Sequence, residues 1–481
     1  MPPALRVRLS AMMFLQFFIW SAWYVTMGPY LRDVLAFSPR QIGWVYNATA
    51  VAAMISPFVI GMVADRFFAA ERVMACLHLV GAGFMFAVSR AAKFEVFYPL
   101  LIGHTLCFMP TVALANTLAM KQMSNPGKQF PHIALLGTIG WIAAGQLLNL
   151  FQTRAMTTPI SFQLAAGVSL IMAAYALTLP HTPPKAAGRR ATAREVLGLD
   201  ALRMLREPSF AVFVITAFLF CIPLTLYWGF ATMFLQDMGV ANVVGTMTIG
   251  QASQIVFMLL MPFVLGRLGV KWVFALALLG WATRYGLFHL GYEGAGPWSL
   301  YLGVALHGIC YVFFFVLAYI YVDQEAPEAI RTRAQGFISL VTLGLGFFVG
   351  SIIAGWTVQQ FSFPNAEPAR HRVLSDPTRW TEGSFAKWER TDGPVYGRIV
   401  KIQRRESDAA QWNAAVEILD RTAGPYAASG KTETVLLSAL SKPVTLWGKV
   451  WLAGSSSCLI LMVPFLLVFR CFPVESASRA R

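Results

Sequence analysis

Two glutamines three residues apart, Gln251 and Gln254, lie within a long apolar stretch of this chain. On a helix, residues at this spacing share one face, so both side-chain amides present N–H donors and carbonyl acceptors to the same point. That chemistry suits a neutral solute that is polyhydroxylated or heterocyclic. The alternative is hydrogen bonding to neighbouring helices, which glutamines in membranes also do.

Further polar and aromatic side chains stand inside apolar stretches, where a polar group is costly unless it faces protein or a water-filled path. Tryptophans there offer flat surfaces on which a planar or sugar-like ligand stacks, with packing and interface anchoring as alternatives. The residues predicted to bind a solute are Gln16, Asn116, Thr138, Trp141, Thr225, Trp228, Gln251 and Gln254.

Arg284 is the charged residue placed farthest inside an apolar stretch. It requires an anion, carbonyl groups or a route to the membrane surface, and structural pairing is favoured over contact with a solute. Acidic residues fall at the ends of the apolar stretches, so a deeply buried acid of the kind that relays protons is not evident. His104 and His307 remain as candidates for proton transfer, with hydrogen-bonded packing as the alternative.

Groupings typical of enzymes are absent from the sequence, including paired carboxylates within an apolar helical turn, a nucleophile elbow and a histidine pair at metal-ligand spacing. The stretch GPYAASGKT at 424–432 resembles a phosphate-binding loop only at its end, because its two glycines are one residue too far apart. The sequence therefore predicts a protein that is not an enzyme and that needs no cofactor or metal.

The composition indicates which elements hold these side chains. Of 481 residues, 57% are hydrophobic and 13% are charged, and the mean hydropathy is +0.59, which is too apolar for a soluble globular protein. We therefore expect an all-α membrane protein with about twelve transmembrane helices. The apolar windows are 9–31, 41–63, 72–90, 96–119, 133–152, 160–179, 209–235, 244–265, 270–291, 298–322, 333–357 and 444–470.

The formal net charge of +15 is distributed unevenly along the chain. Lys and Arg concentrate in the short loops on the side of the N-terminus, with a cluster at 185–206, and are fewer in the opposite loops. Positive residues favour the cytoplasmic side, so both termini are expected in the cytoplasm. The charge follows the membrane topology and gives no reason to expect nucleic-acid binding.

The apolar windows fall into two groups of similar size. We expect an N-terminal six-helix bundle at 1–180, a cytoplasmic linker at 181–208 and a C-terminal six-helix bundle at 209–481. The linker residues Val196, Leu199, Leu202 and Leu205 recur at helical spacing, which predicts an amphipathic surface helix.

A polar stretch at about 358–443 interrupts the second group and is expected as a small exterior insertion. Ser407 is a candidate N-cap for a helix there, and the apolar stripe of that helix is Ala409, Trp412, Val416 and Leu419. A long loop of this kind is a functional lid or a plain insertion, and we favour the insertion.

The loop after the second window contains GMVADR at 61–66, and a weaker echo, LGRLGVK at 265–271, follows the eighth. Together with the two groups of windows, these motifs resemble the major facilitator superfamily, whose fold consists of two six-helix bundles. In that superfamily the glycine of the loop lets helices approach closely, and its Asp and Arg pair across the cytoplasmic gate. The resemblance implies gating roles for Gly61, Asp65 and Arg66.

Within that superfamily, the chain resembles the bacterial nucleoside:proton symporters. The resemblance covers nearly the whole chain except 358–443. It implies an inner-membrane transporter that carries nucleosides by alternating access, with protons as the expected coupling ion and the bilayer as its surroundings. The matching stretches are FLQFFIWSAWYVTMGPY at 14–30, MPTVALANT at 109–117, LLGTIGW at 135–141, LTLPH at 177–181, LGLDA at 197–201, WATRYGLF at 281–288 and AIRTRAQGF at 329–337.

Several polar positions of those symporters differ in this chain. Their fifth helix has an arginine four residues before its threonine, where this chain has Ala134 before Thr138. The buried aspartate of their tenth helix aligns with Val312. On the seventh helix, Thr225 and Trp228 replace Gln and Asn, and on the eighth, Gln251 and Gln254 align with Gln and Glu. Transport of another neutral solute, such as a sugar, and a non-transporting receptor are therefore the alternatives.

Overall fold

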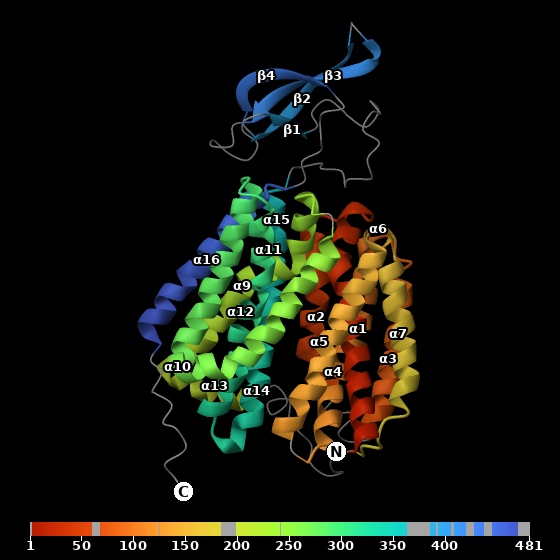
Figure 1. Cartoon of the computed structure of the whole chain (residues 1–481), viewed down its shortest axis with the longest axis vertical. Helices are drawn as coiled ribbons and strands as arrows, with labels where there is room; N and C mark the ends of the chain where they lie inside the picture. Colours follow the sequence, from red (N-terminus) through yellow and green to blue (C-terminus); the bar gives the residue numbers. More distant parts are fainter. Residues whose placement is uncertain are drawn as a thin grey trace.

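The computed structural model describes residues 2–59, 68–124, 126–183, 199–240, 242–362, 385–390, 393–405, 408–419, 428–436 and 445–469. Its helices lie side by side along the long axis, and a small sheet lies beyond one end of them (Figure 1). The start of α1 and the C-terminal end of α16 lie at the opposite end. We call the end that carries the sheet the sheet end, and both α1 and α9 finish there, at Asp33 and Asp237. The other end, where α1 begins, is called the termini end.

The first part of the chain forms helices that pack mainly on one another: α1 contacts α5 and α7, α3 contacts α4 and α7, and α2 contacts α4. Their bounds are α1 Pro3–Asp33, α2 Pro39–Val59, α3 Ala70–Val88, α4 Phe94–Lys121, α5 Pro126–Leu150, α6 Gln152–Thr157 and α7 Ile160–Ala176.

The helices of the second part of the chain also pack mainly on one another: α10 contacts α11, α12 and α16, and α9 contacts α15 and α16. Contacts between the two parts run from α1 to α9, from α2 to α15 and from α5 to α10. The bounds are η2 Leu199–Arg206, α9 Pro208–Asp237, α10 Val243–Tyr292, α11 Pro297–Ala305, α12 His307–Tyr311, η3 Val312–Val316, α13 Leu317–Glu325, η4 Glu328–Ile330, α14 Arg331–Ser339, η5 Leu340–Gly346, α15 Phe347–Gln360 and α16 Trp447–Val468.

The long helix α10 contains a kink at Gly269, whose φ of 71° lies in the left-handed region that glycine adopts without steric cost. This kink separates the two apolar windows predicted at 244–265 and 270–291. Among the described residues, nine helices are long and apolar enough to cross a membrane, with α10 counted once. The structure therefore confirms a helical membrane protein.

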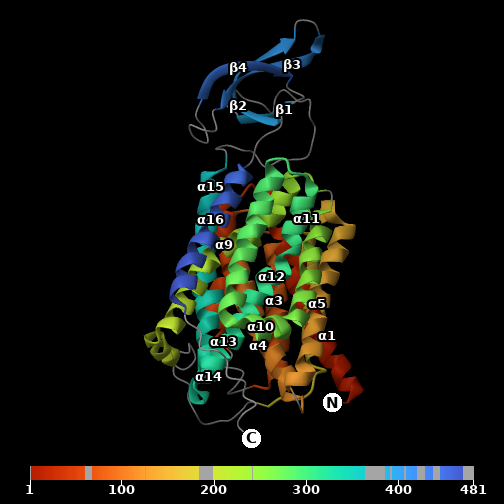
Figure 2. The ribbon, with the colours of Figure 1, turned by 60° about the vertical axis from the view of Figure 1, so that its left-hand side comes forward.

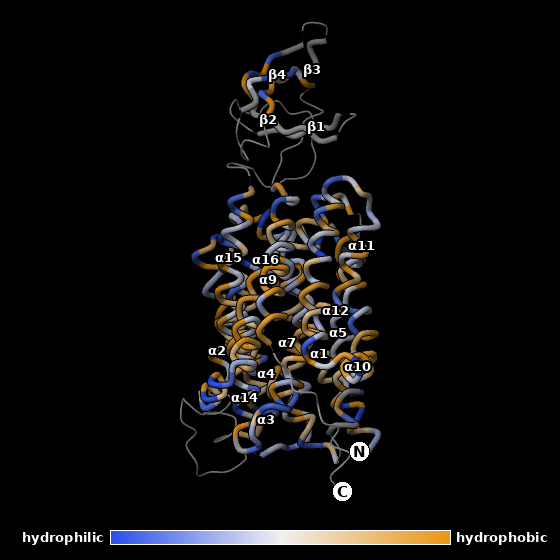
Figure 3. The backbone as a smooth tube through the Cα atoms, turned by 90° about the vertical axis from the view of Figure 1, so that its left-hand side faces the viewer, coloured by the Kyte–Doolittle hydropathy of each residue, from blue (hydrophilic) through white to orange (hydrophobic). Residues whose placement is uncertain are grey.

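The helices bury large aromatic side chains against one another and expose apolar side chains outward. Trp23, Trp281 and Trp451 are fully buried, whereas Leu259 and Leu467 are 78% and 75% exposed. Such an apolar surface is unfavourable in water and suits lipid. The hydropathy colouring shows apolar residues through the body of the helices and more hydrophilic ones near their ends (Figure 3).

The sheet consists of four antiparallel strands in sequence order: β1 Phe385–Arg390, β2 Gly393–Arg405, β3 Asp408–Leu419 and β4 Ala428–Leu436. The helix predicted over Ala409–Leu419 is wrong, because these residues form β3. In this strand Ala414 and Val416 are both fully buried, which is the two-residue period of a strand with one covered face. Ser407, the predicted cap, lies outside the described residues.

The sheet is joined to the helices by a narrow neck. Ser362 follows α15, Thr445 precedes α16, and their hydroxyl oxygens lie 2.9 Å apart in a hydrogen bond. The backbone N–H of Leu446 donates to the carbonyl of Phe361 at 2.8 Å. The chain therefore leaves and re-enters the helices at one point, and the sheet stays above the ends of α15 and α16 in both views (Figure 2).

The linker before α9 is described from Leu199 onward, whereas 184–198 lies outside the described residues. Its described part is the short 3₁₀ helix η2, which packs on α9 and α14, so the extended amphipathic helix is not seen there. The Arg333 guanidinium donates to the Asp200 carboxylate at 2.8 Å and fixes η2 to α14.

Candidate binding site

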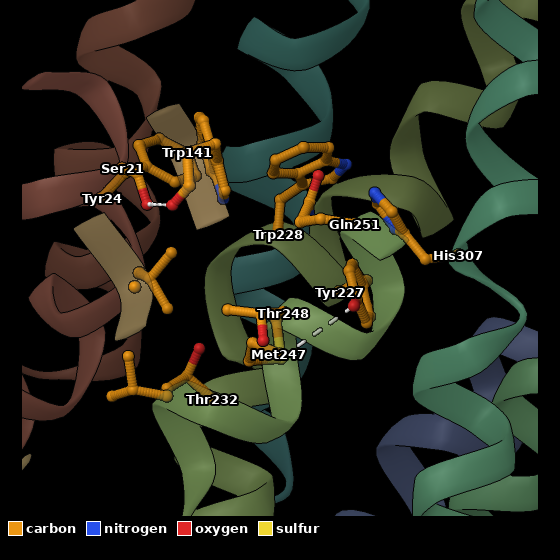
Figure 4. A pocket seen from close by; sticks show the side chains of 13 residues that line it. Ser21, Tyr24, Trp141, Tyr227, Trp228, Thr232, Met247, Thr248, Gln251 and His307 are labelled. Atoms are coloured by element: carbon orange, nitrogen blue, oxygen red, sulfur yellow. Dashed lines mark hydrogen bonds between the residues drawn. The ribbon is translucent and has the colours of Figure 1, made fainter. Parts of the chain in front are cut away.

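A cavity lies between the two parts of the chain, with α1 and α5 on one side and α9, α10 and α12 on the other (Figure 4). Its volume is about 30 Å³, room for about two or three water molecules, so a larger solute enters only after wall side chains move. The wall consists of Ser21, Tyr24, Val25, Trp141, Gly145, Tyr227, Trp228, Thr232, Val244, Met247, Thr248, Gln251 and His307.

Aromatic rings from three helices form the middle of this wall. Tyr24 of α1 contacts Trp141 of α5 and Trp228 of α9, with ring centroids 6.4 and 5.9 Å away. The Trp20 ring lies behind Trp141 at 5.8 Å. The indole N–H of Trp228 is buried and has no hydrogen-bond partner among the described residues. Flat apolar surfaces of this kind stack on planar ligands.

Two hydroxyls of the wall are already engaged within the protein. Ser21 donates to the Trp141 carbonyl at 2.9 Å. Thr248 donates to the Gly245 carbonyl at 2.7 Å and accepts from the amide of Gln146, also at 2.7 Å. Gln251, one helical turn after Thr248, is half-buried and brings a carboxamide to the same side of the cavity (Figure 4).

His307 is a deeply buried polar side chain of the wall, at 1% exposure. Its ring is stacked on Tyr227 at 5.6 Å and meets Trp228 edge-on at 5.8 Å. Neither ring nitrogen has a hydrogen-bond partner among the described residues. The sequence had indicated this residue only as a candidate for proton transfer.

Arg284 lies directly behind Tyr227. The side chain is fully buried, and its guanidinium carbon lies 3.9 Å from the centroid of the Tyr227 ring. Nε donates to the Gly303 carbonyl at 2.9 Å, while Nη1 has no partner among the described residues. Arg284 thus reaches backbone carbonyls and an aromatic face in place of the membrane surface.

Three of the residues predicted to bind a solute line this cavity: Trp141, Trp228 and Gln251. Gln254 is buried at 9% exposure but does not line it, so the two glutamines do not meet at one point there. Thr225 donates to the Ile222 carbonyl at 2.8 Å. Thr138 and Asn116 are half-buried on other parts of α5 and α4.

Gln16 belongs to a separate buried cluster in the first part of the chain. Its amide N–H donates to the Thr111 hydroxyl at 2.8 Å, and its carbonyl lies 3.0 Å from Nε2 of His78. Nδ1 of His78 lies 3.0 Å from the Ser169 hydroxyl. Both ring nitrogens of His78 and both ends of the Gln16 amide therefore have partners.

The sequence reasoning missed Ser21, Tyr24 and Tyr227 as wall residues. Tyr24 lies one helical turn after Trp20, and Tyr227 adjoins Trp228, so a search for tyrosines near tryptophans would have found both tyrosines, whereas nothing in the local sequence marks Ser21. The predicted gating residues Gly61, Asp65 and Arg66 lie outside the described residues.

Above the cavity, at the sheet end, charged side chains join α1 to α9. Arg32 donates to Asp33 at 2.6 Å and to Asp237 at 2.9 Å, and Gln236 donates back to Asp33 at 2.9 Å. The indole N–H of Trp447 also donates to Asp237, at 2.7 Å. Arg32 and Asp33 are each 8% exposed, so this cluster is a buried connection between the two parts of the chain.

The model of the nucleoside H+ symporter family matches residues 4–369. A protein of Escherichia coli (strain K12) named putative nucleoside transporter YegT is 40% identical over 386 residues, which cover 78% of this chain and 90% of YegT. The xanthosine permease of the same organism is 32% identical over 374 residues, covering 75% of this chain and 89% of the permease.

Solved structures agree with the sequence relatives. A crystal structure of a mutant of the nucleoside transporter NupG superimposes with a TM-score of 0.75 and 25% sequence identity, over 97% of this chain and all of that one. The expected resemblance to the nucleoside symporters is thereby confirmed.

Proposed function

This chain belongs to the nucleoside H+ symporter family, and from that premise we propose that it carries nucleosides across a bacterial inner membrane together with protons. The observation that supports this most directly is the cavity between the two parts of the chain. It combines the rings of Tyr24, Trp141 and Trp228 with the carboxamide of Gln251. A nucleoside has a planar heterocycle and a polyhydroxylated sugar, and this wall offers a counterpart to each.

The fold that we propose is twelve transmembrane helices in two bundles, 1–180 and 209–481. The two halves of α10 count as separate crossings, and α2 and α7 complete the set begun by the long apolar helices. The bundles meet along α1–α9, α2–α15 and α5–α10, and the cavity lies at this junction.

Alternating access explains why the free volume is so small. The Arg32–Asp237 contact and the Gln146–Thr248 contact hold the bundles together between the cavity and the sheet end. A nucleoside then enters after the bundles separate, and rocking of one bundle against the other exposes the site to each side in turn. Gly61, Asp65 and Arg66 are the gating residues proposed for the termini end.

The distribution of Lys and Arg supports an orientation with both termini in the cytoplasm and the sheet outside. In this orientation the structure is closed toward the exterior. Proton coupling rests on the family, since the wall of the cavity includes no carboxylate among its described residues.

Within this site, Trp141 and Trp228 are proposed to stack on the base and Gln251 to hydrogen-bond to the solute. Gln254, Thr138, Thr225, Gln16 and Asn116 remain predictions from the sequence. They require a bound conformation that differs from the present one if they are to touch a solute.

Uptake into proteoliposomes tests the proposal. Labelled uridine, adenosine, xanthosine and a hexose are offered with and without an inward proton gradient. We expect nucleoside uptake that the gradient accelerates, and uptake that a protonophore reduces to the rate without a gradient. Hexose uptake without nucleoside uptake would reject nucleosides as the substrate, whereas the absence of any transport would favour a receptor.

A further inference from the structure

His307 is a buried wall residue whose polar atoms the protein leaves without partners. A buried polar group that lacks a hydrogen bond is destabilising, and native proteins supply a partner to nearly all such groups. The Tyr227 ring is stacked on the imidazole and the Trp228 ring meets it edge-on, while the side chain lines the cavity, so a partner reaches its nitrogens from the cavity. This combination indicates a ligand contact that packing alone does not explain.

The local backbone fixes the position of this ring. Helix α11 ends at Ala305, α12 begins at His307, and the π-helical turn η3 follows. Interrupted helices and π-helical turns are frequent at binding sites within membranes. The N–H of Gly308 donates to the Ser253 hydroxyl at 2.8 Å, which holds this break against α10.

Gly250 leaves the space that the imidazole occupies. A Cβ atom at this position would lie 2.9 Å from the Cβ of His307, which is too close for a real side chain. The ring therefore packs among neighbours on α9 and α10 and against Tyr311 of α12, which hold it at the cavity.

We propose that His307 hydrogen-bonds to a ribose hydroxyl of the carried nucleoside and so selects ribonucleosides over deoxynucleosides; this rests on the proposed function. A neutral imidazole has one donor and one acceptor nitrogen, and a hydroxyl satisfies either one because it both donates and accepts. The rings of Tyr24 and Trp141 lie on the opposite wall and, together with Trp228, suit the planar base (Figure 4). The sugar then faces His307 and Gln251.

The experiment measures how well uridine, 2′-deoxyuridine and 3′-deoxyuridine compete with labelled uridine in proteoliposomes. For the unaltered protein we expect one of the deoxynucleosides to compete about tenfold less well than uridine, because a buried group loses its partner. In His307→Leu, uridine is expected to lose this advantage, so that the competitors agree within about twofold. His307→Gln keeps a donor and an acceptor and is expected to restore part of the preference.

His78→Leu is the matched control, because it removes another buried histidine that does not line the cavity. It is expected to keep the ribose preference even where the yield of folded protein falls. Ratios of competitors do not depend on how much protein is folded, so reduced stability does not imitate the predicted result.

An unchanged preference in His307→Leu, or equal competition by all three nucleosides in the unaltered protein, would overturn this inference alone. If the unaltered protein transported no nucleoside at all, the proposed function would fail and the inference with it.

Discussion

Two buried histidines of this protein have opposite surroundings. His78 lies among α1, α3 and α7, where Gln16 and Ser169 engage both ring nitrogens. His307 lies among α9, α10 and α12, where both ring nitrogens lack partners among the described residues. Both side chains are about 1% exposed, so burial alone does not distinguish them.

The difference separates structure from binding. In the cluster around His78, both ring nitrogens and both ends of the Gln16 amide pair with atoms that the chain supplies, so the cluster stabilises the packing of α1, α3, α4 and α7 without help from a ligand. Around His307, the protein provides an enclosure but not the partners. Hydrogen bonding thus distinguishes these two histidines, which burial and residue type do not.

The largest effect is expected from His78→Leu. The substitution leaves the Gln16 carbonyl buried without a partner and deprives the Ser169 hydroxyl of one, which costs about 2 to 4 kcal/mol of unfolding free energy. Thermal denaturation of the purified protein in detergent measures this loss. His307→Leu breaks no hydrogen bond and is expected to change stability by less than about 1 kcal/mol. Equal losses in the two variants would remove the contrast between the clusters.

The next largest effect concerns the closure above the cavity. Asp237→Asn weakens the bond from Arg32 across α1 and α9, while Arg32 keeps its contact with Asp33. We expect the sheet end to open more often, by a factor of about ten in the population of open molecules. A membrane-impermeant thiol reagent applied from the sheet side, with cysteine placed at Val25, reports this opening. The same cysteine with Asp237 intact is the control, and equal labelling rates would show that the ion pair does not hold the closed state.

A smaller effect is expected for Gln251→Ala, which removes a wall amide on the same side as His307. One lost hydrogen bond to an uncharged solute weakens its affinity by up to about tenfold. Transport is measured as a function of uridine concentration. Gln254→Ala serves as the comparison, because Gln254 does not line the cavity. If Gln254→Ala weakens uridine affinity more than Gln251→Ala, the bound conformation uses the face of α10 that the sequence pattern predicted.

The smallest effect is expected from replacing 363–444 with a short Gly/Ser turn. The hydroxyls of Ser362 and Thr445 already meet, so a turn closes the gap between α15 and α16 without displacing either helix. Nucleoside uptake is expected to stay within about twofold of that of the full chain. Loss of uptake in a variant that still folds would make the sheet a lid and contradict the interpretation of this region as an insertion.

The helices were predictable because membrane-spanning segments must satisfy their own backbone hydrogen bonds, which makes long apolar windows a reliable signal. Even the kink of α10 falls between two separate windows, at Gly269. The strand β3 was mistaken for a helix because Ala409, Trp412 and Val416 fit a helical stripe, and pairing with β2 and β4 decides otherwise.

The site was predictable only in part. The sequence identified Gln251, Trp141 and Trp228, because amides and indoles are conspicuous in apolar segments. It did not distinguish Gln16, whose amide is fully engaged with α3 and α4, from Gln251 at the cavity. That distinction depends on partners that are far away in sequence, such as Thr111 and His78, and a local pattern does not carry this information.

The neck formed by Ser362 and Thr445 has a consequence for how this chain folds and varies. Because hydrogen bonds join the two ends of the segment, α15 and α16 are connected through a loop that carries the whole sheet. The entropy lost on closing a loop grows only with the logarithm of its length, at about 0.6 kcal/mol for each doubling. Lineages can therefore gain, lengthen or lose this segment at small thermodynamic cost, while the helices beneath it keep their packing.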